Sequence, residues 1–267
     1  MTEKTPKAEA VKERLETQLR ELHLPSFRSS YEELARQAEA ETLSYECYLL
    51  NLSDQECQER WRRKIERLLR ESCLPLEKTF ATFDLKRLPT KVARQVQSLR
   101  EGDFGDRKEN LLGFGKPGSG KTHLLCALAH DLVHKGRRVR FTTCSLLVQG
   151  LLAAKRDLKL SRLLKRLASY EVLLIDDLGY VQQDRAEMEV LFTLLAERYE
   201  RGSVLLTSNL PFSGWEAIFK DPMTTAAAID RLVHHFVIVE LNIPSYRAEQ
   251  AKKAKQARPT AVEEGGT

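Results

Sequence analysis

The spacing of hydrophobic residues divides this chain into two parts. Between residues 8 and 72, apolar side chains recur at helical spacing, as at Leu15, Leu19 and Leu22. From residue 110 onward, short apolar runs alternate with longer amphipathic segments. This change of periodicity predicts a small all-α domain followed by a larger α/β domain.

Breaks in the helical pattern predict where the N-terminal helices begin and end. The sequence Leu24-Pro25-Ser26 ends the first helix, and Ser30 is a candidate cap for the next one. A second break at residues 42–44 precedes a long helix to Arg70, for which Asp54 is a candidate cap.

Composition shifts along the chain predict its domain boundaries. We expect a helical N-terminal domain over residues 1–75, a linker over 76–105, an α/β domain over 106–258 and a disordered tail over 259–267.

The second part shows regularly alternating strand and helix patterns. Strands are predicted near residues 110–114, 137–142, 171–176, 203–208 and 235–240. Helices are predicted near residues 121–134, 145–153, 157–169, 184–201, 224–234 and 245–257. Five strands joined by crossover helices predict an α/β fold with a parallel, doubly wound five-stranded sheet.

Composition narrows the class of protein. Of the 267 residues, 42% are hydrophobic and 30% are charged, and no apolar run is long enough to cross a membrane. The charged N-terminus does not resemble a signal peptide. Five cysteines without a C-x-x-C pair are typical of reduced thiols rather than a zinc site. We therefore expect a cytoplasmic protein, and its net charge of +5 is compatible with nucleic-acid binding.

Residues 115–122 match the pattern G-x-x-x-x-G-K-[ST] in full. In this pattern, backbone amides of a glycine-rich turn surround phosphate oxygens, the lysine reaches the β- and γ-phosphates, and the hydroxyl binds Mg²⁺. A chance glycine-rich turn is disfavoured because an apolar strand precedes it and a helical pattern follows it. The residues expected to bind the nucleotide are Gly115, Lys116, Pro117, Gly118, Ser119, Gly120, Lys121, Thr122 and His123.

Two carboxylates follow the apolar run that begins at Val172. Asp176 is expected to bind Mg²⁺ together with Thr122, and Asp177 to orient or deprotonate the attacking water. Parallel sheets bind ligands at the carboxyl ends of their strands, which is where both acids lie. The alternative is a simple Asp-Asp-Leu-Gly turn after a buried strand.

Three further polar residues are candidates for contact with the transferred phosphate. Asn209 ends another apolar strand, Arg231 lies in a predicted helix, and Arg247 opens the last helix. Arg231 is a candidate cation supplied to the nucleotide of a neighbouring subunit. A strand-end turn for Asn209 and surface ion pairs for the two arginines remain open.

Two basic stripes are candidates for DNA contact. Each is expected to form one face of an amphipathic helix and to follow a phosphate backbone without reading sequence. The first stripe comprises Arg60, Arg63, Lys64, Arg67 and Arg70. The second stripe comprises Lys155, Lys159, Arg162 and Arg166, and the apolar face expected opposite it comprises Leu160, Leu163, Leu164 and Leu167. The alternative is a solvated helix surface.

An ordered set of motifs also resembles a known family. The motifs occupy residues 115–123, 175–180, 206–212, 229–235 and 245–247. Residues 19–25, 43–46 and 78–84 add to the similarity, which extends to about Ala251. Together these segments resemble the IstB-like transposition helper ATPases, AAA+ proteins of the initiator and helicase-loader branch that are related to the DnaC-type loader.

The resemblance implies a AAA+ core with a reduced or absent helical lid. It places Lys121, Thr122, Asp176 and Asp177 in the two nucleotide motifs of an ATP- and Mg²⁺-dependent ATPase. It further implies that Asn209 is the first sensor, Arg231 the finger acting on a neighbouring subunit, and Arg247 the second sensor.

The resemblance also implies partners. Such proteins form homo-oligomers on double-stranded DNA, with ATP sites at subunit interfaces, and present the target to a partner transposase. ATP hydrolysis then resets the assembly. The N-terminal helices would contribute to oligomer, DNA or transposase contacts.

One departure affects the expected chemistry. Many AAA+ proteins have Glu where this chain has Asp177, and the aspartate is shorter by one methylene. The carboxylate would therefore lie farther from the attacking water, although hydrolysis remains the expectation. Two alternative functions stay open: a DnaC-type replicative helicase loader that prefers single-stranded DNA, and a nucleotide-switched scaffold that binds ATP but barely hydrolyses it.

Overall fold

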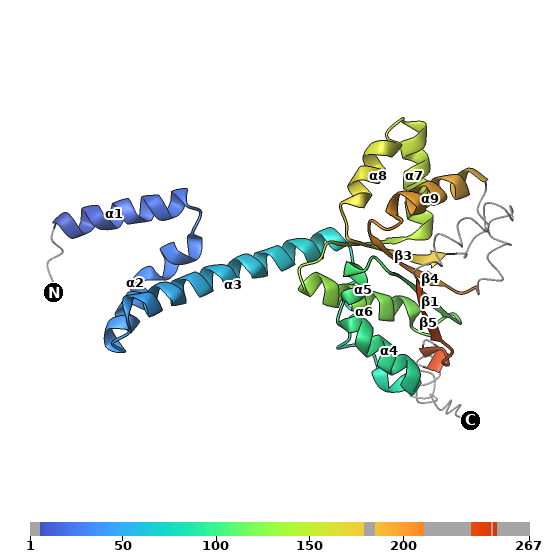
Figure 1. Ribbon diagram of the computed structural model, residues 1–267, viewed down its shortest axis with the longest axis horizontal. Coiled ribbons are helices and arrows are strands. Elements are labelled where there is room, and N and C mark those ends of the chain that lie inside the picture. Colours follow the sequence, from blue (N-terminus) through green and yellow to red (C-terminus); the bar gives the residue numbers. More distant parts are fainter. Residues whose placement is uncertain (1–5, 179–184, 211–235, 247, 250–267) are drawn as a thin grey trace, which may run out of the picture. The chain divides into compact units, whose positions relative to one another are not determined.

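A computed structural model describes residues 6–178, 185–210, 236–246 and 248–249 of the chain. The chain divides into two compact units, Met1–Arg67 and Leu68–Thr267 (Figure 1). Each unit is described by itself.

The first unit is built from helices. Helix α1 spans Pro6–Glu21 and α2 spans Pro25–Ala40, while α3 spans Tyr45–Ser72 and so continues past the end of the unit. Helix α2 contacts α3, and the Tyr48 hydroxyl donates a hydrogen bond of 3.0 Å to the backbone carbonyl of Tyr31. The all-α prediction for this part of the chain is confirmed within the described residues.

Two predicted helix caps in this unit are wrong. Ser30 lies inside α2, which begins at Pro25 because proline is favoured in a first turn, where its missing N–H is not needed. Asp54 lies inside α3, which begins at Tyr45. The Ser44 hydroxyl instead accepts a hydrogen bond of 3.3 Å from the Cys47 amide, which satisfies one free donor of the first turn.

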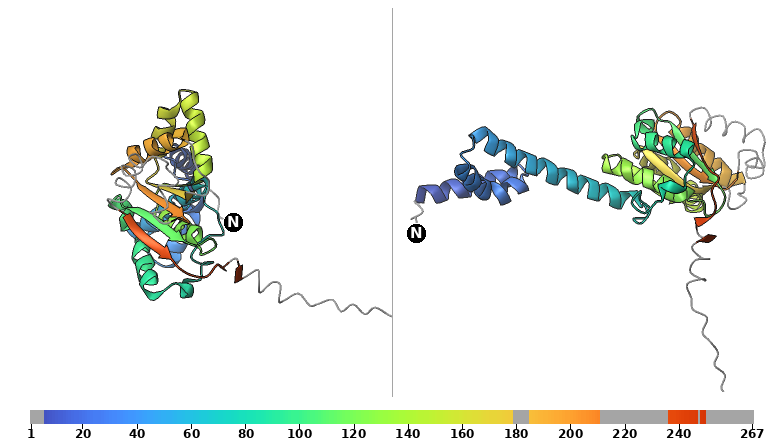
Figure 2. Two further views of the ribbon diagram at one scale, coloured as in Figure 1. Left: turned by 90° about the vertical axis from the view of Figure 1, so that its right-hand side faces the viewer. Right: turned by 90° about the horizontal axis from the view of Figure 1, so that it is seen from below.

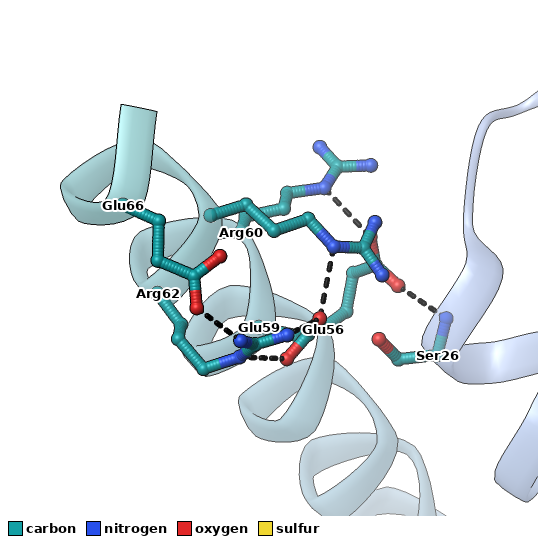
Figure 3. Close-up of polar contacts among 7 residues, drawn as sticks. Ser26, Glu56, Glu59, Arg60, Arg62 and Glu66 are labelled. Carbon is teal, nitrogen blue, oxygen red and sulfur yellow. Dashed lines mark hydrogen bonds and ion pairs between the residues drawn. The ribbon is translucent and has the colours of Figure 1, made fainter. Parts of the chain in front are cut away.

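A buried carboxylate connects α3 to the start of α2. Glu56 is 4% exposed, and its carboxylate accepts hydrogen bonds from the Ser26 amide at 2.8 Å and from Arg60 Nε at 2.7 Å (Figure 3). Arg60 also donates to the His23 carbonyl at 2.8 Å. Burial raises the pKa of Glu56, but the hydrogen bonds from Arg60 and Ser26 outweigh it, so the pKa lies below its ordinary value of 4.5.

The Glu56 carboxylate is expected to hold the corner between α1 and α2 on α3. Glu56→Gln replaces a charged acceptor by a neutral one, so we expect the free energy of opening this corner to fall by about 1–3 kcal/mol. Hydrogen exchange of the α2 amides in the full chain measures this change, with the exposed Glu33→Gln as the matched control.

The pH dependence of the same exchange provides a second check. A carboxyl group whose folded pKa is lowered stabilises the fold above its unfolded pKa, and the contribution is lost as pH falls through the folded pKa. Protection of α2 in the unmodified chain should therefore decrease below about pH 4.5. Equal pH dependence in Glu56→Gln would contradict this role.

The second unit contains a five-stranded sheet with the order β2-β3-β4-β1-β5 (Figure 2). Its strands are β1 (Asn110–Gly115), β2 (Val139–Thr143), β3 (Val172–Leu178), β4 (Ser203–Ser208) and β5 (Phe236–Leu241). Every paired neighbour runs parallel. The predicted parallel five-stranded sheet is confirmed.

Helices cover both faces of this sheet. One face carries α7 (Cys144–Arg156), α8 (Leu160–Ala168) and α9 (Arg185–Arg198), and the other carries α6 (Lys121–His134) with shorter helices (Figure 1). The core is centred on β3 and β4, where Leu173, Leu174 and Ile175 are fully buried. These residues form the continuous apolar run that is typical of a central parallel strand.

The segment expected to be a linker is largely structured. It contains the short 3₁₀ helix η1 (Leu85–Arg87), α4 (Thr90–Arg100) and α5 (Asp103–Asp106). Val96, Leu99 and Phe104 are buried, and Arg100 pairs with Asp131 of α6 at 2.9 Å. Helix α4 therefore belongs to the α/β unit, because its apolar face packs on that unit.

A buried arginine joins three segments of the core. Arg198 is 3% exposed and donates hydrogen bonds to the carbonyls of Leu167, Tyr170, Glu171 and Ser203 at 2.9–3.2 Å. Burial lowers its pKa to about 10. These bonds satisfy carbonyls at the turn before β3 and at the start of β4, so the arginine has a structural role.

Other sequence predictions fall partly outside the described residues. The helix predicted at 224–234, most of the helix at 245–257 and the tail at 259–267 lie there. All five cysteines have free thiols, and burial raises the pKa of Cys126 to about 12. Among the helices that the structure describes, none has the length and apolar character that crossing a membrane requires.

Candidate nucleotide-binding site

The glycine-rich loop connects β1 to α6 and has a backbone that only small residues adopt easily. Gly118 and Gly120 have φ values of +79° and +94°. A methyl group at Gly118 would lie 2.1 Å from the hydroxyl oxygen of Ser245, so the loop also passes close to the chain after β5. Gly120 directly precedes α6, whose N-terminus therefore faces the loop.

Lys121, the first residue of α6, is held by the loop and by a neighbouring strand. Its ammonium group donates to the carbonyls of Gly115 at 2.8 Å and Lys116 at 3.1 Å. It also donates to Oδ1 of Asn209, just after β4, at 2.7 Å. The sheet order produces this last contact, because β4 lies directly beside β1.

Asp176 lies beside the hydroxyl group predicted to share a metal with it. The Thr122 hydroxyl donates to Asp176 Oδ1 at 2.7 Å, although the two residues are 54 positions apart. The Thr207 hydroxyl donates to the same oxygen at 2.6 Å. The fold thus brings Thr122 and Asp176 together, as predicted. Oxygen atoms of this kind are suitable ligands for Mg²⁺.

Asp177 has an uncommon backbone conformation. Its φ is +68°, and the register between β3 and β4 shifts between Ile175 and Leu178. The Asp177 amide donates to Thr207 Oγ1 at 2.7 Å, and Asn209 Nδ2 donates to Asp177 Oδ1 at 3.1 Å. Aspartate and asparagine tolerate this left-handed region better than most residues, which makes Asp favourable at this bulge.

These groups line a cavity of about 350 Å³. The glycine-rich loop, Asp176, Asp177 and Asn209 form one part of its wall. Residues 82–84 and the side chains of Arg87, Ile243 and Tyr246 form another. The cavity therefore has a polar part suited to phosphates and a part with aromatic and aliphatic side chains.

His123 connects the loop helix to the chain before α4. Its Nε2 lies 3.0 Å from the Thr79 carbonyl and 3.2 Å from the Thr82 hydroxyl. Its ring also contacts Phe83 edge to face, with centroids 5.1 Å apart. A nucleotide-binding role for His123 remains a prediction, and its contacts here are with the protein.

Sequence reasoning from single motifs missed Phe83, Arg87 and Tyr246 as cavity residues. Arg87 forms an ion pair with Glu249 at 2.8 Å and lies over the Tyr246 ring, 5.1 Å from its centroid. For Phe83, the available signal was an aromatic residue in a segment otherwise read as a linker.

The donor set fits a triphosphate and Mg²⁺. Ser119 Oγ is buried and has no hydrogen-bond partner among the described residues, so it is a free donor within the loop. No cluster of three metal-ligating side chains occurs in the described parts of the chain. Mg²⁺ in nucleotide sites commonly takes one or two protein ligands and completes its shell with phosphates and water.

The first predicted DNA stripe lies on α3 and is rich in internal ion pairs. Arg60 is bound to Glu56 as described (Figure 3), and Arg63 pairs with Glu59 at 2.8 Å. Lys64 lies over the Trp61 ring at 4.9 Å. Arg67 and Arg70 follow on the same helix. These contacts fit a salt-bridged helix surface and leave DNA contact as a prediction.

The second predicted stripe does not lie along one helix face. Helix α7 ends at Arg156, and Leu158 has a φ of +56°, so Lys155 and Lys159 are separated by a turn. Lys155 pairs with Glu189 at 2.9 Å, whereas Arg162 and Arg166 lie on α8. The leucines predicted opposite, Leu160, Leu163, Leu164 and Leu167, do pack on the core. Arg231 and Arg247 lie outside the described residues.

Solved structures identify the class of this α/β unit. It resembles the DnaC helicase loader, with 18% identity and a TM-score of 0.52 over 62% of this chain and 98% of that one. It also resembles AMPPCP-bound DnaA of Aquifex aeolicus, with 18% identity and a TM-score of 0.54 over 69% of this chain and 56% of that one. These likenesses show that the fold is of the AAA+ type.

Sequence comparisons then identify the family. The model of the IstB-like ATP-binding proteins matches residues 17–254. An insertion-sequence ATP-binding protein of Sinorhizobium fredii is 42% identical over 92% of this chain and 83% of its own length. The insertion sequence IS21 ATP-binding protein of Pseudomonas aeruginosa is 36% identical over 90% and 91%. The chain therefore belongs to the IstB-like ATP-binding family of insertion sequences.

Proposed function

We propose that this chain is an ATP-dependent helper of transposition that assembles on double-stranded DNA and recruits a partner transposase. Membership of an ATP-binding family of insertion sequences supports this role. The observation that most supports ATP hydrolysis is that Thr122, Asp176 and Asp177 lie together beside the glycine-rich loop.

In the proposed reaction, ATP is hydrolysed to ADP and phosphate. The loop amides and Lys121 bind the phosphates, and the Thr122 hydroxyl and Asp176 carboxylate hold Mg²⁺. The bound metal ion would neutralise charge that develops on the phosphates. Asp177 orients and deprotonates water for attack on the γ-phosphate, and Asn209 positions Asp177.

The remaining roles concern assembly. Arg231 is proposed as the cation that reaches a neighbouring subunit's nucleotide, and Arg247 as a second sensor of the same site. Both roles require a homo-oligomer with ATP at subunit interfaces. ATP-bound oligomers would select the target DNA in the cytoplasm. Hydrolysis of ATP would then release the assembly from the DNA.

DNA contact is proposed for the cations that lie on exposed helices. Arg162 and Arg166 of α8 are exposed, whereas the leucines between them pack against the core, so the two charges are directed to solvent. The α3 cations are a second candidate set, for which Arg60 and Arg63 would exchange their carboxylate partners for phosphates. Such contacts bind DNA through charge and give little sequence specificity.

Sedimentation of the protein with DNA tests the proposal. We expect a large complex with duplex DNA in the presence of ATP and Mg²⁺, and much less with ADP or with single-stranded DNA. A preference for single strands would favour the helicase-loader function instead. Absence of any DNA complex with either nucleotide would contradict the DNA-assembly role and favour a nucleotide-switched scaffold.

A further inference from the structure

Thr207 lies at the point where β4 approaches the two acidic residues of β3. It is 1% exposed and pairs with Gly113 of β1 in the sheet. Its side chain faces Asp176 and the amide of Asp177. A polar side chain in such a buried position needs hydrogen-bond partners, and here both partners belong to the candidate site.

One hydroxyl group serves both acids. Thr207 Oγ1 accepts the Asp177 N–H at 2.7 Å and donates its own proton to Asp176 Oδ1 at 2.6 Å. Because a hydroxyl carries a single proton, the Asp176 carboxylate oxygen must accept it, and the direction of both bonds is defined. The β-branched threonine side chain has few rotamers, which further fixes the position of the oxygen.

This bond has a consequence for the Asp176 carboxylate. Oδ1 accepts two hydroxyl donors, from Thr122 and Thr207, while Oδ2 accepts no hydrogen bond within the described part of the chain. Two donors on one oxygen restrict rotation of the carboxylate. The other oxygen is thereby left to bind a metal ion directly or through water.

The same hydroxyl holds the backbone of Asp177. A φ of +68° is uncommon for a residue other than glycine and needs support from its surroundings. Two hydrogen bonds together provide that support. The Asp177 N–H donates to the Thr207 hydroxyl, and the Asn209 side chain donates to the Asp177 carboxylate. Loss of the Thr207 hydroxyl would free the Asp177 amide at the bulge between β3 and β4.

We propose that Thr207 is a positioning residue that sets the Mg²⁺-binding carboxylate of Asp176 and the water-orienting carboxylate of Asp177 at the same time. This inference rests on the proposed ATPase function of the site. Thr207 acts through the two acids, because its hydroxyl group is hydrogen-bonded to both of them. Hydrogen bonds that orient metal ligands commonly affect metal affinity or activity by about 10–100-fold.

Thr207→Val is the decisive variant, because it keeps the shape of the side chain and removes the hydroxyl. ATP affinity is measured by calorimetry in EDTA and in Mg²⁺, and hydrolysis is measured over a Mg²⁺ titration. We expect the affinity for ATP in EDTA to stay within about twofold of that of the unmodified chain. The Mg²⁺ concentration needed for half-maximal turnover should rise about 10–100-fold, and the turnover should fall by a similar factor. Thr207→Ser should recover most of both losses.

A matched control is Thr193→Val, in which the lost hydroxyl donates to the Glu189 carbonyl within α9. It should leave the Mg²⁺ dependence unchanged. If Thr207→Val does not fold, Thr207→Ala makes the same test, because the smaller side chain removes the hydroxyl without a steric clash.

Three results would overturn the inference. The first is an unchanged Mg²⁺ requirement and turnover in Thr207→Val. The second is a loss of turnover in Thr207→Ser as large as that in Thr207→Val. The third is a loss of ATP affinity by Thr207→Val that is as large in EDTA as in Mg²⁺. Failure of the proposed function looks different, because the unmodified chain would then show no Mg²⁺-dependent ATP hydrolysis. The Mg²⁺ dependence of ATP binding would still report on Thr207 in that case.

Discussion

Lys121→Ala is expected to weaken ATP binding severely and thereby to abolish ATP-dependent assembly on DNA. In a glycine-rich phosphate site the lysine donates charge-assisted hydrogen bonds to two phosphates. At about 1.5–3 kcal/mol for each bond, the affinity for ATP should fall roughly 10²- to 10⁴-fold. Binding of a fluorescent ATP analogue, followed by sedimentation with duplex DNA, measures both effects.

The structure indicates that the fold should tolerate this change. Lys121 itself lines the cavity, so water that enters the cavity can replace its ammonium group beside the carbonyls of Gly115 and Lys116. The exposed Lys91→Ala in α4 provides a matched control outside the cavity. If a folded Lys121→Ala protein still formed the ATP-dependent DNA complex, nucleotide gating of assembly would be wrong.

Asp177→Asn is expected to reduce ATP hydrolysis about 100-fold while leaving ATP binding nearly unchanged. Asparagine retains an oxygen that can accept the hydrogen bond from Asn209 but cannot take a proton from water. It is also a better test than alanine, because the φ of +68° at this position favours Asp and Asn and would strain alanine. Steady-state phosphate release, compared with nucleotide affinity, separates the two effects.

Asp54→Asn on the exposed surface of α3 serves as the control for this change. Unchanged turnover in Asp177→Asn would favour the nucleotide-switched scaffold over an ATPase. Asp177→Glu tests separately whether the short side chain of Asp177 limits hydrolysis. An increase in turnover would show that the additional methylene group of glutamate improves the position of the carboxylate.

Predictions that depend on neighbouring residues in the sequence were the most successful. The glycine-rich loop, its preceding strand and its following helix occupy one continuous segment, so backbone freedom and apolar spacing suffice to locate them. The same holds for the buried strand before Asp176, and for the leucine face of α8. In each case the physical signal lies within one helix or strand.

Helix ends and the linker were predicted less well, because tertiary packing decided them. Helix α2 begins at Pro25, before Ser30, and the exposed Asp54 lies inside the continuous helix α3. Val96 and Leu99 have helical spacing, but only their burial in the α/β unit shows that residues 90–100 are not a connector.

The sequence by itself determined the fold class, the position of the glycine-rich loop and the identity of the two acids near the end of β3, because local spacing encodes these features. Only the tertiary structure decided that β4 lies between β3 and β1, and therefore that Thr207 reaches both acids and Asn209 reaches Lys121. Strand order is set by how distant segments bury their apolar faces together. Contacts between residues 30 to 90 positions apart depend on that order and leave no local signal in the chain.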